Sequence, residues 1–130
     1  MKSSYSTMVV ASFNDDDVTV IDAESLQPIA TWPVGTGFGV ILHPTQPIAY
    51  SMESFDDSVR VINYETGAAI ASIEPGQFPT YSAIAPDGRV LYVVNEDSQN
   101  VTLIDTQTNQ RIDRVAVGNA PANAVVVGDR

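Results

Sequence analysis

The sequence repeats itself three times at a nearly constant spacing. Residues 18–22 (VTVID) return as residues 59–63 (VRVIN) and again as residues 101–105 (VTLID), in steps of 41 and 42 residues. Other markers keep the same steps: Gly35, Gly76, Gly118, Tyr50 and Tyr92. A period of about 40–45 residues built from short apolar runs is typical of a β-propeller, in which each repeat supplies the strands of one blade.

Every recognisable segment of the chain predicts a β-strand. The runs are short, rich in β-branched and aromatic residues, and separated by turns that contain Gly, Pro, Asn or Asp. No segment has the i, i+3, i+4, i+7 apolar pattern of a helix. A β-sandwich does not require strands that recur in register, so the constant spacing favours a propeller. Twelve strands are expected, at residues 7–12, 18–22, 28–32, 38–42, 48–52, 59–62, 69–73, 81–85, 90–94, 101–104, 112–117 and 124–127.

The composition excludes several classes of protein. A hydrophobic content of 44% with 17% charged residues argues against disorder, and no apolar run approaches the roughly 18 residues of a membrane span. The absence of cysteine excludes disulfides, thiolate metal sites and a cysteine nucleophile. A net charge of −10 disfavours nucleic acid and anionic membranes as partners. The same charge suits cations or basic partners, although acidic residues more often serve solubility.

The N-terminus gives little information about the compartment. Residues 1–6 carry one positive side chain and are not followed by an apolar core, so no secretory signal is expected. The protein is therefore expected in the cytoplasm, or outside it if a leader has been removed.

Two stretches carry a more specific signature. Residues 76–79 (GQFP) form a Gly-x-x-Pro loop, followed by residues 85–95 (APDGRVLYVVN), and residues 117–121 (VGNAP) repeat the loop. These motifs resemble the YVTN repeat of WD-like β-propellers, over about residues 5–129. The first repeat departs from the pattern, because Phe38 stands where Pro79 stands in the second. The resemblance implies a propeller surface used for binding, as in surface-layer proteins, or a subunit of a redox or lactonase-like enzyme.

The phase of the repeats predicts how the propeller closes. The Gly-x-x-Pro loop leads into the innermost strand of a blade, so residues 81–85 and 124–127 are expected to be innermost strands. A single domain, residues 1–130, would then hold three four-stranded blades, with repeats at about 5–46, 47–88 and 89–129. The chain would be circularly permuted, with its ends between innermost and second strands.

Three blades are too few for a closed ring, because propellers usually have about 4–8 blades and strand edges are rarely left bare. We therefore expect a six-bladed ring formed by a homodimer, closed by strand exchange under a two-fold axis. The C-terminal strand of each chain would complete the N-terminal blade of the other. The alternative is a fragment cut from a longer propeller; the whole number of blades favours a complete unit.

Candidate ligand-binding residues lie in loops that open onto the central channel. Aromatic and amide groups at a channel mouth could bind a peptide, a sugar or a small ligand, or could pack the channel wall instead. The candidates are Phe38, Gln77, Phe78, Asn119 and Asn123.

Acidic turns recur between the second and third strands of each repeat. They are expected on the same ring face as the glycine loops, the loops that contain Gly35, Gly76 and Gly118. Calcium requires several oxygen ligands, but the spacing matches no calcium loop and adjacent aspartates on a turn diverge. Solvated turn residues are therefore the simpler interpretation, and calcium is the one cofactor considered. The candidate metal ligands are Asp15, Asp16, Asp56, Asp57, Glu96 and Asp97.

No catalytic residue is predicted. His43 is the only histidine, and a lone histidine at a strand end is more often structural than catalytic. No serine has the context of a nucleophile elbow, and Trp32 is expected to pack between blades. The leading function is therefore a non-enzymatic binding or scaffold propeller that presents a loop face and channel mouth to a protein or small ligand. The alternative is a propeller enzyme or enzyme subunit, either a metal-dependent lactonase-like hydrolase or part of a redox complex.

Overall fold

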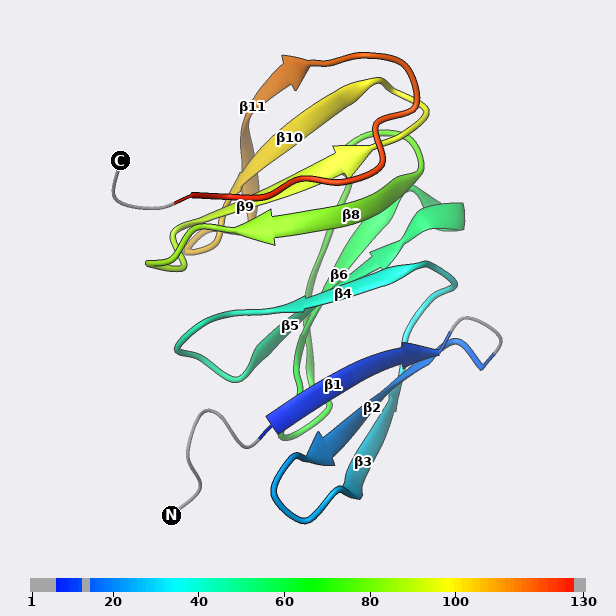
Figure 1. Cartoon of the computed structure of the whole chain (residues 1–130), viewed down its shortest axis with the longest axis vertical. Helices are drawn as coiled ribbons and strands as arrows, with labels where there is room; N and C mark the ends of the chain where they lie inside the picture. Colours follow the sequence, from blue (N-terminus) through cyan, green and yellow to red (C-terminus); the bar gives the residue numbers. More distant parts are fainter. Residues whose placement is uncertain (1–6, 13–14, 128–130) are drawn as a thin grey trace.

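The computed structural model describes residues 7–12 and 15–127, which form eleven β-strands in three antiparallel sheets (Figure 1). The first sheet contains β1 (Thr7–Ser12), β2 (Asp17–Asp22) and β3 (Gln27–Pro33). The second contains β4 (Gly39–Leu42), β5 (Ile48–Glu53), β6 (Ser58–Asn63) and β7 (Ala69–Ile73). The third contains β8 (Pro79–Ile84), β9 (Val90–Asn95), β10 (Asn100–Asp105) and β11 (Gln110–Ala116). A short 3-10 helix, η2 (Ser54–Asp56), joins β5 to β6 where only a turn was expected. Within these described ranges, no helix is long and apolar enough to cross a membrane.

Each sheet is a meander in which consecutive strands are neighbours. The repeated turn after β2, β6 and β10 has one cause in all three sheets. Its Asp or Asn side chain accepts a hydrogen bond from the backbone two residues on: Glu24 N to Asp22 at 3.1 Å, Glu65 N to Asn63 at 2.9 Å and Gln107 N to Asp105 at 2.8 Å. Such turns are encoded locally by the Asx side chain, so the recurring VID and VIN sequences end each strand at the same place.

The sheets pack face to face through two apolar layers. Along β5, Ala49 faces the first sheet and the neighbouring Tyr50 faces the third, so the middle sheet is buried on both sides. This burial explains why the strand sequence is apolar at successive positions. The first layer contains Val18, Val34, Ala49 and Ile62. The second contains Tyr50, Met52, Val59, Val61, Ile73, Leu91, Val93 and Ile104.

Trp32 packs across the first layer, as expected. Its indole Nε1 donates a hydrogen bond of 2.8 Å to the carbonyl oxygen of Tyr64 in the second sheet. Its ring also covers Gly67, where an added Cβ would lie 2.3 Å from the Trp32 Cε3 atom. Gly67 has a φ of +80°, so glycine is favoured there by both backbone and space.

Tyr50 is fully buried in the second layer, and its hydroxyl has no hydrogen-bond partner among the described residues. Burial disfavours the phenolate and raises the pKa of Tyr50 from 10.0 to about 12. At neutral pH the side chain therefore acts as a large apolar group of the core.

Replacing Tyr50 by Phe is expected to reduce the loss of stability at high pH. As the pH rises above 10.0, the phenol of Tyr50 ionises in the unfolded chain while it is still protonated in the folded chain. The free energy of unfolding is therefore unaffected by this group below pH 10 and falls as the pH rises toward 12. At about pH 11 the wild type should have lost on the order of 1 kcal/mol through this residue, which Tyr50→Phe would not lose. Urea denaturation at about pH 9 and about pH 11 measures the difference. The exposed Tyr81→Phe is the control, and equal behaviour of the two variants would contradict the prediction.

Eleven of the twelve expected strands are confirmed, with ends that differ by up to two residues. The twelfth was wrong for this single chain, because residues 124–127 form no strand and Val125 is 82% exposed. A strand needs a neighbour for its backbone hydrogen bonds, and the last described residues run alongside the third sheet without pairing (Figure 1). The sheets accordingly have three, four and four strands instead of four each, and the first begins with a strand equivalent to β5 and β9. The permutation, the repeat boundaries and the two-chain ring stay predictions.

Candidate functional site

Three phenylalanine rings meet on the face formed by the glycine loops. Phe38 precedes β4, Phe55 lies in η2 and Phe78 precedes β8. Their ring centroids are 5.7 Å apart for Phe38 and Phe55, 6.0 Å for Phe38 and Phe78, and 5.3 Å for Phe55 and Phe78. Phe38 is 52% exposed and Phe55 is 56% exposed. We call these three residues the aromatic cluster.

Phe38 and Phe78 were expected at a channel mouth, whereas Phe55 was missed. It stands beside Asp56 and Asp57, so in the sequence it belongs to a turn whose pattern is acidic. The tie to the neighbouring loop is made by Ser54, whose hydroxyl donates a 2.5 Å hydrogen bond to the carbonyl oxygen of Pro79. This contact spans 25 residues of sequence, so no local pattern could have revealed it.

A buried carboxylate holds the loop before β4. Glu53, at the end of β5, is only 2% exposed. Its Oε2 accepts a 2.6 Å hydrogen bond from Gly35 N and forms an ion pair with Arg60, whose Nε lies 2.8 Å away. Its Oε1 accepts a 3.1 Å hydrogen bond from the Ser58 hydroxyl. These contacts satisfy both oxygens and fix the approach of the chain to Phe38.

The third sheet uses an amide in the same place. Asn95, at the end of β9, lies against Gly76, where an added Cβ would be 2.7 Å from the Asn95 side-chain carbon. The Asn95 Nδ2 donates to Thr102 Oγ1 at 2.9 Å and to Asn100 Oδ1 at 2.8 Å. Gly35 and Gly76 are therefore required by close packing against a strand-end side chain.

The candidate metal ligands do structural work in the acidic turns. Asp16 accepts a 2.6 Å hydrogen bond from the Thr36 hydroxyl, and Asp57 accepts a 2.9 Å hydrogen bond from Phe78 N. Both aspartates have a left-handed backbone, with φ of 53° and 55°. Each turn thus ties its own sheet to the loop that leads into the next sheet.

The other acidic candidates show no common focus. Asp15, Asp56 and Asp97 are exposed, and Glu96 is half-buried, with its backbone N donating to Phe78 O at 3.0 Å. Over residues 7–12 and 15–127, no three His, Cys, Asp or Glu side chains gather in a way that could hold a metal ion. The metal interpretation gains no geometric support and stays a prediction.

An apolar hollow of about 580 Å³ runs along the inner strands next to the aromatic cluster. Two of the predicted ligand residues, Phe38 and Asn123, line it together with parts of β1, β4 and β8. Gln77 is exposed beside Phe78, and its backbone N donates to Ser98 Oγ at 2.7 Å. Asn119 is exposed in the loop after β11 and does not line the hollow.

His43 has a structural role of the kind expected. Its Nδ1 accepts hydrogen bonds of 3.2 Å from the backbone N of both Thr45 and Gln46, which closes the turn before β5. Its ring covers Gly88, where an added Cβ would lie 2.6 Å from the His43 Nε2. The histidine therefore joins the turns of two neighbouring sheets.

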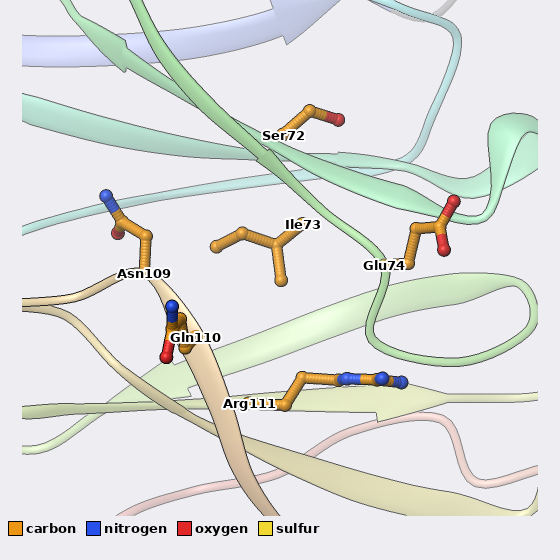
Figure 2. A pocket seen from close by; sticks show the side chains of 6 residues that line it. All are labelled: Ser72, Ile73, Glu74, Asn109, Gln110 and Arg111. Carbon is orange, nitrogen blue, oxygen red and sulfur yellow. The ribbon is translucent and has the colours of Figure 1, made fainter.

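A second, more polar hollow of about 500 Å³ lies between the outer strands of the second and third sheets. Figure 2 shows Ile73 at its centre, with Asn109 and Gln110 to one side and with Glu74 and Arg111 to the other. The hollow is open, and its polar groups do not converge on a common point (Figure 2). We regard it as the outer seam between two packed sheets.

No protein-family model matches this chain, and no curated protein sequence matches it. Solved structures do: hydrazine synthase of Kuenenia stuttgartiensis has a TM-score of 0.85 over 91% of this chain at 22% identity. The dihydro-heme d1 dehydrogenase NirN in complex with DHE has a TM-score of 0.75 over 95% at 22% identity. AztD of Citrobacter koseri has a TM-score of 0.78 over 95% at 15% identity.

These similarities concern part of each protein. The chain spans 35% of the hydrazine synthase chain, 27% of the NirN chain and 35% of the AztD chain. At such low identities the likeness establishes the fold alone. The YVTN relationship stays a prediction, since the repeat motifs are its only support. The three structures are β-propeller-like, and the chain has a β-propeller-like fold whose three antiparallel sheets correspond to blades.

Proposed function

We propose that the protein is a non-enzymatic binding or scaffold propeller that presents its loop face to a partner. The observation that carries this proposal is the aromatic cluster, in which Phe38 and Phe55 remain more than half exposed although they touch each other. Exposed apolar area costs about 25 cal/mol per Å², so a group of neighbouring exposed aromatic rings favours an interaction site.

The surroundings of the cluster indicate the chemistry of the partner. Asp56 and Asp57 follow Phe55 directly, and the backbones of Glu96 and Asp97 bond to the loop that carries Phe78. Aromatic rings with a polar, charged rim have the composition of an interaction hot spot. The chain has a net charge of −10, and these acidic turns would make the face complementary to a basic segment of a protein that also carries aromatic or apolar side chains.

We also propose that two chains close one six-bladed ring. Support comes from the two end faces of the stack, which are apolar and partly uncovered: Met8 and Val10 on the first sheet are 43% and 40% exposed, and Tyr81 and Val115 on the third are each 51% exposed. Docking the third sheet of one chain on the first sheet of the other would cover both faces twice under a two-fold axis. The ring would carry two aromatic clusters on one face.

The enzyme alternative draws on the names of similar structures, which include a synthase and a dehydrogenase. A lactonase-like hydrolase would require a metal, and a redox subunit would require a cofactor or a redox partner. Elemental analysis that finds a stoichiometric divalent ion would favour this alternative over the binding function.

Removal of two rings is expected to weaken binding of a basic aromatic peptide by roughly 10-fold or more, because buried aromatic anchors dominate such interfaces. The variant is Phe38→Ser with Phe78→Ser, and the probe is a labelled peptide of alternating Arg and Tyr, measured by fluorescence anisotropy. The control variant is Leu26→Asn, which removes an apolar side chain that is 69% exposed in the turn between β2 and β3. A peptide of alternating Glu and Tyr is the control for charge. Equal binding of the wild type and the double Ser variant, or equal binding of both peptides, would contradict the proposal.

A further inference from the structure

The first sheet lacks the innermost strand that the other two possess. β4 pairs with β5, and β8 pairs with β9, at the inner edges of their sheets. β1 is the repeat equivalent of β5 and β9, yet in the described part of the chain it pairs with β2 alone. Its other edge therefore has no strand partner among residues 7–12 and 15–127, and proteins rarely leave such an edge bare.

The apolar hollow of about 580 Å³ follows this free edge. It is lined by residues 8–11 of β1 and by residues 38–41, together with Tyr81, Ser82 and Asn123 of the same chain. Met8 and Val10 are partly exposed beside it. The hollow thus lies where an extended apolar segment could add to the first sheet and cover the side of β4.

Residues 121–127 have the sequence position of an innermost strand. They follow a Gly-x-x-Pro loop as β8 does, and Val125 and Val127 are 82% and 61% exposed. The loop is already shaped like its equivalents: Ala120 has a φ of 47°, and Phe78, 42 residues earlier, has a φ of 55°. The loop therefore has the backbone turn of its equivalent, whereas residues 121–127 form no strand within the described chain.

Gly118 provides an independent sign that a contact is missing. Added Cβ atoms at Gly35 and Gly76 would collide with the strand-end side chains of Glu53 and Asn95, whereas one at Gly118 would meet nothing within 4 Å. By the repeat, the corresponding strand end in the first sheet is Ser12, at the end of β1. A loop equivalent to two tightly packed loops is thus unpacked, and the strand end that would pack on it is the end of the free edge.

We propose that residues 121–127 of one chain fill this hollow in a second copy, as an antiparallel strand on β1. The register follows from the pairs Val40 with Ser51 and Ser82 with Val93. Carried through the repeat, it places Ala124 opposite Val10 of the second copy, and Val126 opposite Met8. The inference rests on the proposed two-chain ring and gives the hollow and the register in which the closing strand would bind.

The first experiment measures mass and the role of the exposed valine. Light scattering of the unmodified protein at micromolar concentration should give twice the chain mass of 13.9 kDa. Val125→Asp should weaken association at least 10-fold, because the valine would lie buried beside Val9, while far-UV circular dichroism stays unchanged. The control is Leu26→Asp, which changes another exposed apolar side chain that does not line the hollow and should leave the dimer intact.

The second experiment tests the register by disulfide cross-linking. The sequence contains no cysteine, so only the introduced thiols can form a disulfide. The double variant Val10→Cys, Ala124→Cys should form a disulfide between chains, seen as a dimer band without reductant. The control, Val10→Cys with Val126→Cys, keeps the same sheet face but moves one thiol two residues along the strand. That shift puts the Cα atoms beyond the roughly 7 Å that a disulfide allows, so it should give little dimer band.

The outcomes separate the strand from the ring and from the binding function. A monomeric mass overturns both the ring and this proposal, whereas peptide binding by the aromatic cluster needs only one chain. A dimer that Val125→Asp leaves intact, or that cross-links through the shifted pair, keeps the ring and overturns the strand. A disulfide within one chain, with no dimer band, shows that the segment reaches its own β1 and also overturns the exchange.

Discussion

Glu53→Ala should lower the free energy of unfolding by about 2–4 kcal/mol, because it leaves buried donors without an acceptor. The carboxylate is 2% exposed and accepts bonds from Gly35 N, Ser58 and Arg60. The Arg60 side chain is 39% exposed, so in the alanine variant its guanidinium can be hydrated by solvent. The loss of stability should therefore be smaller than for a fully buried ion pair. Removal of the side chain also leaves a cavity against Gly35.

Two further variants make this test specific. Glu53→Gln keeps the shape and one acceptor oxygen, so it should cost less than the alanine variant. Glu24→Ala, at an exposed turn, should change stability by less than about 0.5 kcal/mol. Urea denaturation gives the three values, and hydrogen exchange at the Gly35 amide reports the local loss. An alanine variant as stable as the wild type would show that the carboxylate does not hold this loop.

Gly37→Ala should be at least as damaging, and it should alter the loop face directly. An added Cβ would lie 1.6 Å from the carbonyl oxygen of Met52 and 2.9 Å from Ser54 N, both backbone atoms that cannot turn aside. The chain before Phe38 must therefore move away from η2, at a cost of about 3 kcal/mol or more. Because Phe38 and Phe55 touch across this point, binding of the Arg-Tyr peptide should fall as well.

The matched control for this prediction is Gly118→Ala, where an added Cβ meets nothing within 4 Å. Both glycine variants are compared in the Val125→Asp background, so that association of chains does not enter the measured stability. Gly118→Ala should then stay within about 0.5 kcal/mol of its parent. A Gly37→Ala protein that keeps both its stability and its peptide affinity would show that the loop adjusts freely.

Much of the fold could be predicted because its signals are local. Asp22, Asn63 and Asp105 end their strands through hydrogen bonds to residues two positions away, so the turn is written in a few adjacent letters. The doubly apolar run of β5 predicted a sheet buried on both faces, and the two apolar layers agree for the second sheet. The likeness to β-propeller-like structures supports the same interpretation.

The candidate site could be predicted only in part, because its contacts join distant repeats. Phe38 and Phe78 were expected from equivalent loops, but the ring of Phe55 between them depends on how η2 packs against the next sheet. Asp16 and Asp57 read as acidic turns in the sequence, whereas in space they tie one sheet to the loop of the next.

The sequence by itself determined that the chain makes strands, where most of them turn, and that one unit recurs every 41 or 42 residues. These properties depend on alternation and on side chains bonding to their own backbone, so they survive without knowledge of the neighbours. Only the tertiary structure decided which loops meet, that the carboxylate of Glu53 is buried, that residues 124–127 lie unpaired alongside the third sheet, and that β1 pairs with β2 alone among the described strands. A strand exists only with a partner for its hydrogen bonds, and the presence of that partner is a property of the assembled sheets.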